Sequence, residues 1–305
     1  MNVVYIILIV ILSSILFFLA LYIFLGEYLC NYAFSRNGKY KKNIEKNHKK
    51  KFVDEDDKYW SDAKKIEIKS QDELKLCGYY KDNGNARIVL IIHGFGANHT
   101  EMTMHAKLFE KMGFDILAID TRAHGESEGK YLSFGQNESD DVAKWIEKIL
   151  ALKENYNIVL FGISMGATTA LLSTKILSFQ VKAVISDCAF NNADEQLQYF
   201  YSFRKRKPKF LYKLFIGYAR RTKKIDMKKI DVSSVLKSAN IPILVFHGQD
   251  DNYVPVKNAY EIFESIPAGK GELHLLKNAK HCECLEMNRG EYRKIIINFL
   301  EKNNI

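Results

Sequence analysis

Short apolar runs alternate with amphipathic segments along most of this chain, and that alternation constrains its fold more than any other feature. Residues 87–92 read RIVLII, a β-branched apolar run of the kind expected for a strand buried on both faces. Residues 138–153 place their apolar side chains on one helical face. The same reasoning predicts strands over 64–81 (two, with a turn at 70–73), 115–120, 157–163, 181–186, 241–247 and 272–276, and helices over 105–112, 165–176, 257–265 and 291–302. We therefore expect an α/β domain with a mostly parallel sheet and helices on both faces.

The N-terminus carries an apolar run, from Val3 to Leu25, that no charged residue interrupts. As a helix it would span about 35 Å, enough to cross a hydrocarbon core of about 30 Å. A cleaved signal peptide has a basic start, a shorter apolar core and small residues at the cleavage point, and this run has none of these. We expect one retained transmembrane helix within residues 1–28, with a cleaved signal and a buried core helix as the alternatives.

Basic residues follow this run, whereas none precedes it. They are Arg36, Lys39, Lys41, Lys42, Lys46, Lys49, Lys50 and Lys51, in a chain of net charge +9. The positive-inside rule then places the C-terminal side of the span in the cytoplasm. Residues 29–61 are expected to form a basic linker that contacts anionic lipid headgroups, or one that is simply solvated. Because the chain lacks the folds that read nucleic acid, membrane lipids are the expected partner and nucleic acid is not.

Residues 191–238 interrupt the alternation, because they separate two predicted strands by far more than one crossover. The segment contains the aromatic runs YFYSF at 199–203 and FLYKLFIGYA at 210–219, with basic residues between and after them. We expect a helical cap over the carboxyl edge of the sheet. The sheet domain then occupies residues 62–305, with the cap at about 191–238.

The motif Gly162-Ile163-Ser164-Met165-Gly166 lies between a predicted strand and a predicted helix. In that context G-x-S-x-G is the signature of a nucleophile elbow, a strained turn that exposes the serine hydroxyl. The two glycines tolerate strained dihedrals and close backbone approach, and the helix N-terminus favours developing negative charge. Ser164 is therefore the candidate nucleophile; the alternative is a serine that only caps a helix.

A serine nucleophile needs a general base, and the base needs an orienting acid. This elbow is followed along the chain by the acid and then by the histidine. His281 follows the last predicted strand and is the candidate base. Asp250 and Asp251 follow the strand at 241–247, and adjacent loop residues can both reach the base. The residues alone therefore leave the acid open between them, and either could simply form a turn.

The oxyanion of an acyl-transfer intermediate needs two hydrogen-bond donors. One is expected to be the backbone N–H of Met165, directly after the nucleophile. The other is expected from the loop after the 87–92 strand, where Gly94 and Gly96 let the backbone approach, and we assign it to the N–H of Phe95. His93 is expected to order this loop rather than to transfer protons.

Five motifs occur in a characteristic order along the chain. They are HGFGAN at 93–98, DTRAHGESEG at 120–129, GISMGA at 162–167, HGQDDNYVP at 247–255 and KHCE at 280–283. Together they resemble the α/β-hydrolase superfamily over roughly residues 62–303, and most of all bacterial membrane-anchored hydrolases of the serine aminopeptidase and monoglyceride-lipase-like group. The resemblance implies the α/β-hydrolase fold with a Ser-Asp-His triad, and it selects Asp251 over Asp250 as the acid. It also implies a structural role for the 120–127 loop, in which Ala123 stands where glycine is commoner.

These features predict a serine hydrolase, most simply a carboxylic-ester hydrolase (class EC 3.1.1) that acts on an acyl or lipid-like substrate through an acyl-enzyme. An aminopeptidase or acyltransferase on the same triad is the enzymatic alternative, and a non-catalytic membrane interaction module is the alternative from another class. No cofactor is expected. The residues His281, Cys282, Glu283 and Cys284 are too close in sequence to wrap a tetrahedral metal ion. The chain has five cysteines, and an odd number without regular spacing argues against a disulfide scaffold.

Overall fold

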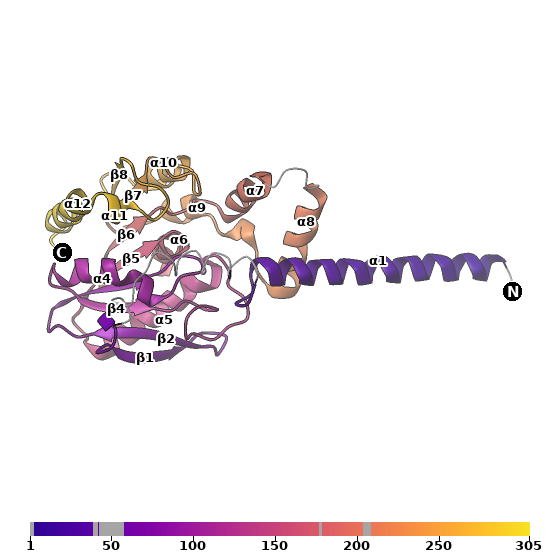
Figure 1. Ribbon diagram of the computed structural model, residues 1–305, viewed down its shortest axis with the longest axis horizontal. Coiled ribbons are helices and arrows are strands. Elements are labelled where there is room, and N and C mark those ends of the chain that lie inside the picture. Colours follow the sequence, from indigo (N-terminus) through magenta and orange to yellow (C-terminus); the bar gives the residue numbers. More distant parts are fainter. Residues whose placement is uncertain (1–2, 39–41, 43–57, 177–178, 204–208) are drawn as a thin grey trace.

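The computed structural model describes residues 3–38, 42, 58–176, 179–203 and 209–305. At its centre lies an eight-stranded sheet in the order β1-β2-β4-β3-β5-β6-β7-β8 (Figure 1). β2 pairs antiparallel with β1 and with β4, and the other neighbouring strands pair in parallel. The strands are β1 (Lys64–Lys69), β2 (Lys75–Lys81), β3 (Arg87–Ile92), β4 (Asp115–Ile119), β5 (Asn157–Ile163), β6 (Val181–Asp187), β7 (Ile243–Gly248) and β8 (Gly271–Leu276). The predicted mostly parallel α/β sheet is confirmed.

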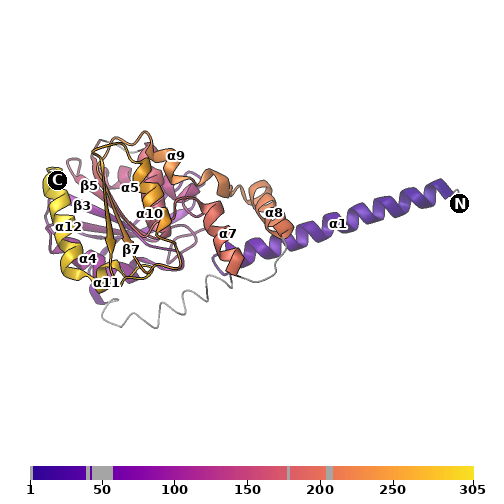
Figure 2. The same cartoon turned by 90° about the horizontal axis from the view of Figure 1, so that it is seen from above.

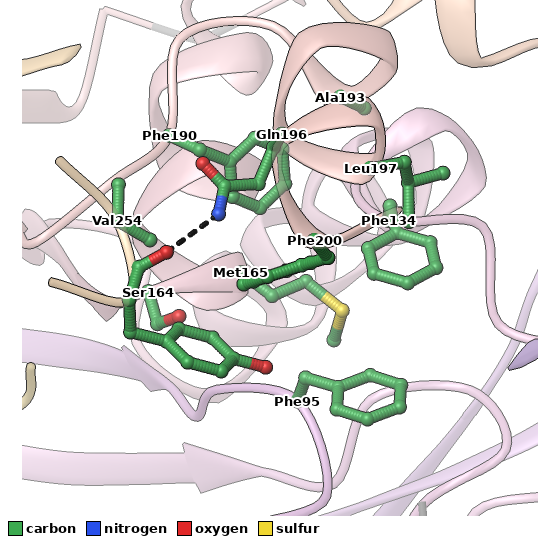
Figure 3. A pocket seen from close by; sticks show the side chains of 11 residues that line it. Phe95, Phe134, Ser164, Met165, Phe190, Ala193, Gln196, Leu197, Phe200 and Val254 are labelled. Carbon is green, nitrogen blue, oxygen red and sulfur yellow. Dashed lines mark hydrogen bonds between the residues drawn. The ribbon is translucent and has the colours of Figure 1, made fainter. Parts of the chain in front are cut away.

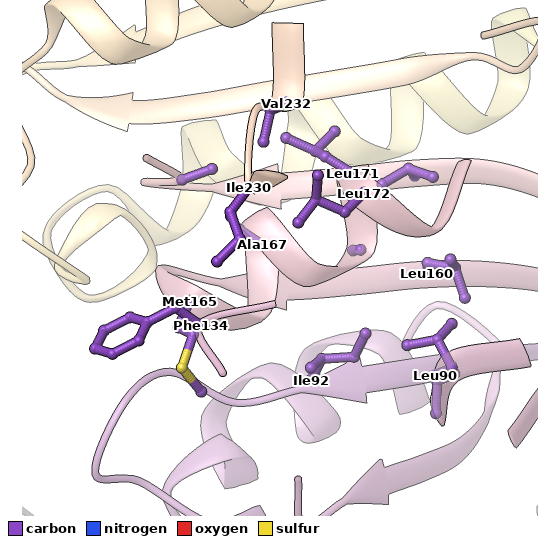
Figure 4. Close-up of a cluster of buried hydrophobic side chains, with 14 of the residues drawn as sticks. Leu90, Ile92, Phe134, Leu160, Met165, Ala167, Leu171, Leu172, Ile230 and Val232 are labelled. Atoms are coloured by element: carbon purple, nitrogen blue, oxygen red, sulfur yellow. The ribbon is translucent and has the colours of Figure 1, made fainter. Parts of the chain in front are cut away.

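Helices cover both faces of this sheet. One face carries α5 (Gln136–Leu152), α6 (Met165–Leu172), α9 (Val232–Leu236) and α10 (Lys257–Ser265), and the other carries α4 (Thr103–Glu110), α11 (Cys284–Met287) and α12 (Arg289–Lys302). β3 shows the division, because Ile88, Leu90 and Ile92 pack with the first group of helices whereas Val89 and Ile91 pack with the second. Figure 4 shows α6 lying over Leu90, Ile92 and Leu160 of the central strands. The apolar strand run is therefore explained by burial on both faces.

The predicted helices are present, with ends that differ by a few residues. The helix predicted from 138 begins at Gln136, because the Glu138 carboxylate accepts hydrogen bonds from the N–H groups of Ser133 and Gly135 and caps the first turn. The helix predicted to reach Ile176 ends at Leu172 and continues as a 3-10 turn over Ser173–Ile176. Further short turns lie at His99–Met102 and Met227–Lys229.

The N-terminal apolar run forms the long helix α1 (Val3–Ala33), which projects away from the sheet domain (Figures 1 and 2). Among the described residues it is the one helix long and apolar enough to cross a membrane. Its apolar side chains from Val3 to Phe24 are largely exposed, and its contacts with the domain begin near Tyr22. A long, apolar, exposed helix of this kind fits a membrane anchor or a signal sequence.

α1 runs past residue 28, where the anchor was expected to end, because its last turns pack against the sheet domain. Cys30 in its last turn and Phe34 directly after it are fully buried. Arg36 does not reach toward lipid as expected for the linker, because its guanidinium donates hydrogen bonds to the carbonyl oxygens of Gly125 and Ser127. The other predicted headgroup-binding residues, apart from Lys42, lie outside the described residues: Lys39, Lys41, Lys46, Lys49, Lys50 and Lys51.

Residues 191–238 contain α7 (Ala193–Phe203) and α8 (Lys209–Tyr218), of which α8 packs against α1 (Figure 2). A π-helical turn over Ala219–Lys223 extends α8. α9, by contrast, packs against α6 and α10, with Val232 and Leu236 fully buried. The described part of this segment is largely helical, as expected, and the limits of a cap domain within it stay a prediction.

Candidate active site

Ser164 occupies the sharp turn between β5 and α6. Its backbone has φ 54° and ψ −117°, a strained conformation for a residue with a side chain. A Cβ at Gly162 would lie 2.3 Å from the carbonyl oxygen of Gly166, and a Cβ at Gly166 would lie 2.1 Å from that of Ile92. Both positions therefore require glycine for steric reasons, as the motif predicted.

The structure brings Ser164, His281 and Asp251 together, although they are far apart in sequence. His281 Nε2 lies 2.8 Å from Ser164 Oγ, and His281 Nδ1 lies 2.7 Å from Asp251 Oδ2. His281 sits in the loop after β8, and Asp251 sits in the loop after β7. With Nδ1–H donating to the carboxylate, Nε2 is free to accept the hydroxyl proton.

The backbone around Asp251 fixes the carboxylate. Its Oδ1 accepts hydrogen bonds from the N–H groups of Tyr253 and Val254, both at 2.8 Å, and its side chain is fully buried. Asp250 is exposed. The two candidates that the residues left open thus occupy different environments, and it is Asp251 that contacts His281.

Opposing influences act on the pKa of His281. Burial lowers it, whereas Cys188 and the Asp251 carboxylate raise it, and the balance lies above the ordinary histidine value of 6.5. Burial raises the pKa of the Cys188 thiol well above its usual range, so that this thiol is uncharged at neutral pH. The charge that acts on His281 near neutrality is therefore the one on Asp251.

The loop after β3 lies directly against the serine. A Cβ at Gly94 would lie 3.4 Å from Ser164 Cβ. His93 orders this loop, because its Nδ1 lies 2.7 Å from the Gly94 carbonyl oxygen while its Nε2 accepts a hydrogen bond from the N–H of Thr121 at 3.0 Å. Phe95, from this loop, and Met165, at the start of α6, both line the same pocket as Ser164. Their role as oxyanion donors stays a prediction.

The loop from Asp120 to Ser127 is hydrogen-bonded to the residues that follow β3. Asp120 Oδ1 accepts hydrogen bonds from the backbone and ring nitrogens of His99, both at 2.9 Å. His124 Nε2 accepts a hydrogen bond from the N–H of Gly96 at 3.1 Å, which links this loop to the loop after β3. Ala123 has φ 61°, which explains why glycine is common at this position. These contacts fit the structural role that the resemblance implied.

Ser164 opens onto an apolar pocket with an empty volume of about 430 Å³. α7 supplies one wall, and Gln196 from that helix donates a hydrogen bond to the carbonyl oxygen of Tyr253 at 2.8 Å. In Figure 3, Ser164 lies at one side of the pocket, whereas Phe95, Phe134 and Leu197 lie at the other. The remaining lining residues are Met165, Ala193, Phe190, Phe200, Tyr253 and Val254.

Two cysteines lie beside His281: Cys282, which the sequence already places next to it, and Cys188, which the sequence did not single out. Cys188 Sγ and Cys282 Sγ lie 3.6 Å apart, and together with a ring nitrogen of His281 they form a group within 4.8 Å. Two cysteines and a histidine at this distance could hold a soft metal ion. Both ring nitrogens of His281 already contact Ser164 and Asp251, however, so a metal ion would have to displace one of these partners. The cluster that the sequence offered, with Glu283 and Cys284, does not form among the described residues.

Asp187 is a second buried carboxyl near the elbow that sequence reasoning missed. It ends β6, and its carbonyl oxygen accepts the N–H of Ser164 at 2.8 Å. Burial raises the pKa of its carboxyl to about 6, and the Tyr292 hydroxyl donates a hydrogen bond to it at 3.0 Å. Its position at the carboxyl end of the strand beside the elbow was the available signal.

A serine on a strand-to-helix elbow, with a histidine and an aspartate from the loops after later strands, defines the α/β-hydrolase class of protein. A sequence model for the alpha/beta hydrolase fold matches residues 87–230. The uncharacterized protein YqkD of Bacillus subtilis is 33% identical over 227 residues, which cover 71% of this chain and 72% of YqkD. This chain therefore belongs to the α/β-hydrolase superfamily and is YqkD-like.

Two further proteins are similar at lower identity. The AB hydrolase superfamily protein YisY of Bacillus subtilis is 22% identical over 251 residues, 70% of this chain and 91% of YisY. An esterase from Pyrococcus furiosus matches with a TM-score of 0.66 and 24% identity, over 79% of this chain and 91% of the esterase. The structural likeness shows a shared fold.

Proposed function

We propose that this chain is a membrane-anchored serine hydrolase that cleaves carboxylic esters of apolar acyl groups, in the serine aminopeptidase and monoglyceride-lipase-like group. The observation that carries the proposal is the position of His281, 2.8 Å from Ser164 Oγ and 2.7 Å from Asp251 Oδ2. This arrangement supplies a nucleophile, a general base and an orienting acid in hydrogen-bond reach of each other.

The reaction follows from these contacts. Ser164 Oγ attacks the acyl carbon while His281 Nε2 takes the hydroxyl proton, and Asp251 stabilises the imidazolium. The negative charge on the former carbonyl oxygen is stabilised by the N–H groups of Phe95 and Met165. As the C–O bond breaks, His281 returns the proton to the leaving alcohol. Water, deprotonated by His281, then releases the acid and restores the Ser164 hydroxyl.

The lining of the pocket supports an apolar acyl group. Aromatic and aliphatic side chains surround Ser164, as is typical of sites that bind apolar groups. A buried apolar chain gains roughly 0.8 kcal/mol per CH₂ group, which favours acyl chains over short polar ones.

The anchor gives the enzyme a membrane location. We place residues 1–28 in the bilayer, assign 29–61 to a basic linker and assign 62–305 to the hydrolase domain, with a cap at about 191–238. The basic residues after the span support a catalytic domain at the cytoplasmic face of the cell membrane.

The test uses the full chain in detergent micelles with p-nitrophenyl esters of increasing acyl length. Wild-type protein should hydrolyse them, and Ser164→Ala should lower kcat by roughly a thousandfold or more. Ser238→Ala, which alters an exposed serine, is the matched control and should retain activity. Near-normal turnover by Ser164→Ala would contradict the proposal. Release of amino acids from peptide amides without ester turnover would favour the aminopeptidase alternative.

A further inference from the structure

The end of α1 is built into the domain rather than attached to it by a free tether. The ring of Tyr22 packs edge-on against that of Tyr218 at the end of α8, with centroids 5.5 Å apart. One turn further, Gly26 lies so close to α8 that a Cβ there would come within 2.3 Å of the Tyr218 ring. α1 and α8 therefore meet in close contact where the exposed apolar run ends.

Glu27 joins three parts of the molecule at this point. Its carboxylate forms an ion pair with Lys223 at 2.6 Å and accepts hydrogen bonds from the hydroxyls of Tyr218 and Tyr131, both at 3.0 Å. Tyr218 and Lys223 belong to α8 and the turn that extends it, whereas Tyr131 belongs to the segment that leads into α5. A half-buried carboxylate bound by these side chains holds the three elements in register.

The chain after α1 then pairs with the same segment. Leu132 N–H donates to the Phe34 carbonyl oxygen at 3.0 Å, and Arg36 N–H donates to the Lys130 carbonyl oxygen at 2.8 Å. Ser35 and Tyr131 form an antiparallel bridge between these two bonds. The segment that carries Tyr131 continues directly to Phe134, which lines the pocket.

The Phe34 side chain completes the connection. It is fully buried, stacks on Phe215 of α8 at 5.0 Å and packs edge-on against Phe134 at 5.6 Å. Phe134 in turn stacks on Phe95 with centroids 5.6 Å apart. A continuous set of rings thus runs from α1 to the pocket wall.

Phe134 depends on such support because its backbone is strained. It has φ 54°, which is unfavourable for a residue with a side chain. In Figure 3 it lies at the side of the pocket away from Ser164, where the distal part of an acyl chain would lie. A change in its packing should therefore affect long acyl chains more than short ones.

We propose that the C-terminal end of α1, together with Phe34 directly after it, is a positioning element of the acyl pocket, in which Phe34 sets the selectivity for acyl-chain length by holding Phe134. Phe34 does not touch the substrate; it acts through Phe134. This inference rests on the proposed esterase function. It makes the anchor helix part of the specificity machinery of the domain and not only its attachment to the membrane.

The experiment compares kcat/KM for acetyl and decanoyl p-nitrophenyl esters in the full chain. Phe34→Ala should lower the decanoyl-to-acetyl ratio on the order of tenfold, mostly through KM for the decanoyl ester. Phe34→Leu, which refills most of the space, should recover much of the ratio. Phe17→Ala removes an equally large ring from the exposed part of α1, where the side chain is 64% exposed, and should leave the ratio unchanged.

A double variant separates positioning from general stability. If Phe34 acts through Phe134, then Phe34→Ala should change the ratio little in a Phe134→Ala background. Equal losses of kcat/KM for the two esters, or an unchanged decanoyl-to-acetyl ratio in a folded Phe34→Ala protein, would overturn the inference. Should the wild type hydrolyse no ester, the proposed function fails by itself. The inference would then be tested by how labelling rates with alkyl fluorophosphonates depend on alkyl length in the wild type and in Phe34→Ala.

Discussion

At the elbow, backbone distances dictate the residue types. Gly162 and Gly166 lie where any Cβ would overlap carbonyl oxygens of neighbouring strands and turns. Ser164 itself bears a positive φ, and such strain costs on the order of 1–3 kcal/mol, which the surrounding hydrogen bonds must offset. The G-x-S-x-G pattern could therefore be recognised from sequence because few other residues satisfy this geometry.

Replacement of Gly166 by alanine tests this steric account. The added Cβ would lie 2.1 Å from the Ile92 carbonyl oxygen, so the elbow must move away from β3. We expect Gly166→Ala to lower kcat/KM at least tenfold and the free energy of unfolding by about 2 kcal/mol. Gly290→Ala, where nothing lies within 4 Å of the new Cβ, should leave kcat/KM unchanged and should not lower the free energy of unfolding, because alanine is the better helix former. Thermal unfolding and ester kinetics measure the two effects.

The Asp251 carboxylate should be visible in the pH dependence. His281 must be neutral to accept the Ser164 proton, so activity is lost as the pH falls through the pKa of His281 in the free enzyme. Asp251 is one of the groups that raise that pKa, so the acidic limb of kcat/KM should lie at higher pH in the wild type than in a protein without this carboxylate. Asp251→Asn should shift the limb to lower pH and reduce kcat by about a thousandfold to ten-thousandfold.

Asp250→Asn is the matched control for this prediction, because Asp250 is exposed in the same loop. It should leave the acidic limb of kcat/KM at the same pH and change kcat by no more than about twofold. A shift in the pH profile with Asp250→Asn, and none with Asp251→Asn, would contradict the assignment of the acid.

The candidate site was only partly predictable at the residue scale. Ser164 and His281 could be found because their motifs and chain order are specific. Asp250 and Asp251 could not be separated by spacing, and it was the family resemblance that selected Asp251. The physical difference is that Asp251 is buried, accepts two backbone N–H groups and contacts His281. The proximity of Cys188 to His281 depends on the packing of distant loops, which no local pattern encodes.

At the scale of elements, the strands were easier to predict than the ends of the helices. The run at 87–92 is apolar throughout because β3 is buried on both faces, and its limits matched. α1 extends beyond the predicted anchor because its last turns pack against the domain, where Gly26 and Cys30 are buried, whereas its earlier turns are exposed. Hydropathy records the apolar run but not this change of surroundings.

Two truncations separate these two parts of α1. Deletion of residues 1–25 removes the exposed run and keeps Glu27 and Phe34, so we expect a folded protein that no longer sediments with membranes and keeps its ester activity. Deletion of residues 1–38 also removes the buried contacts and should lower Tm by at least about 5 °C relative to the shorter deletion. Equal Tm values for the two proteins would show that the end of α1 contributes nothing to the domain.

At the scale of the whole molecule, one long apolar helix and one sheet domain are joined through α8 and the segment before α5 (Figure 2). The overall α/β architecture was predictable because alternating elements of this kind have few arrangements. The way α1 packs on α8 was not, because it depends on Gly26, Glu27 and Tyr218, which meet only in three dimensions.

The orientation of the molecule in the membrane is tested by protease protection. If the domain lies in the cytoplasm, trypsin added outside intact cells should leave the chain uncut, and the same treatment after lysis should digest it. The many lysines and arginines of the chain provide cleavage sites in either case. Digestion of the domain from outside intact cells would reverse the orientation.

The central claim is that Ser164 is a nucleophile activated by His281 and Asp251. Mass spectrometry of the full chain after reaction with an alkyl fluorophosphonate tests it most directly, because the phosphonyl group is transferred only to an activated hydroxyl. The account predicts a single adduct on the peptide that contains Ser164, and its loss in Ser164→Ala and strong reduction in His281→Ala. No adduct in the folded wild type, or an adduct on another residue, would contradict the account.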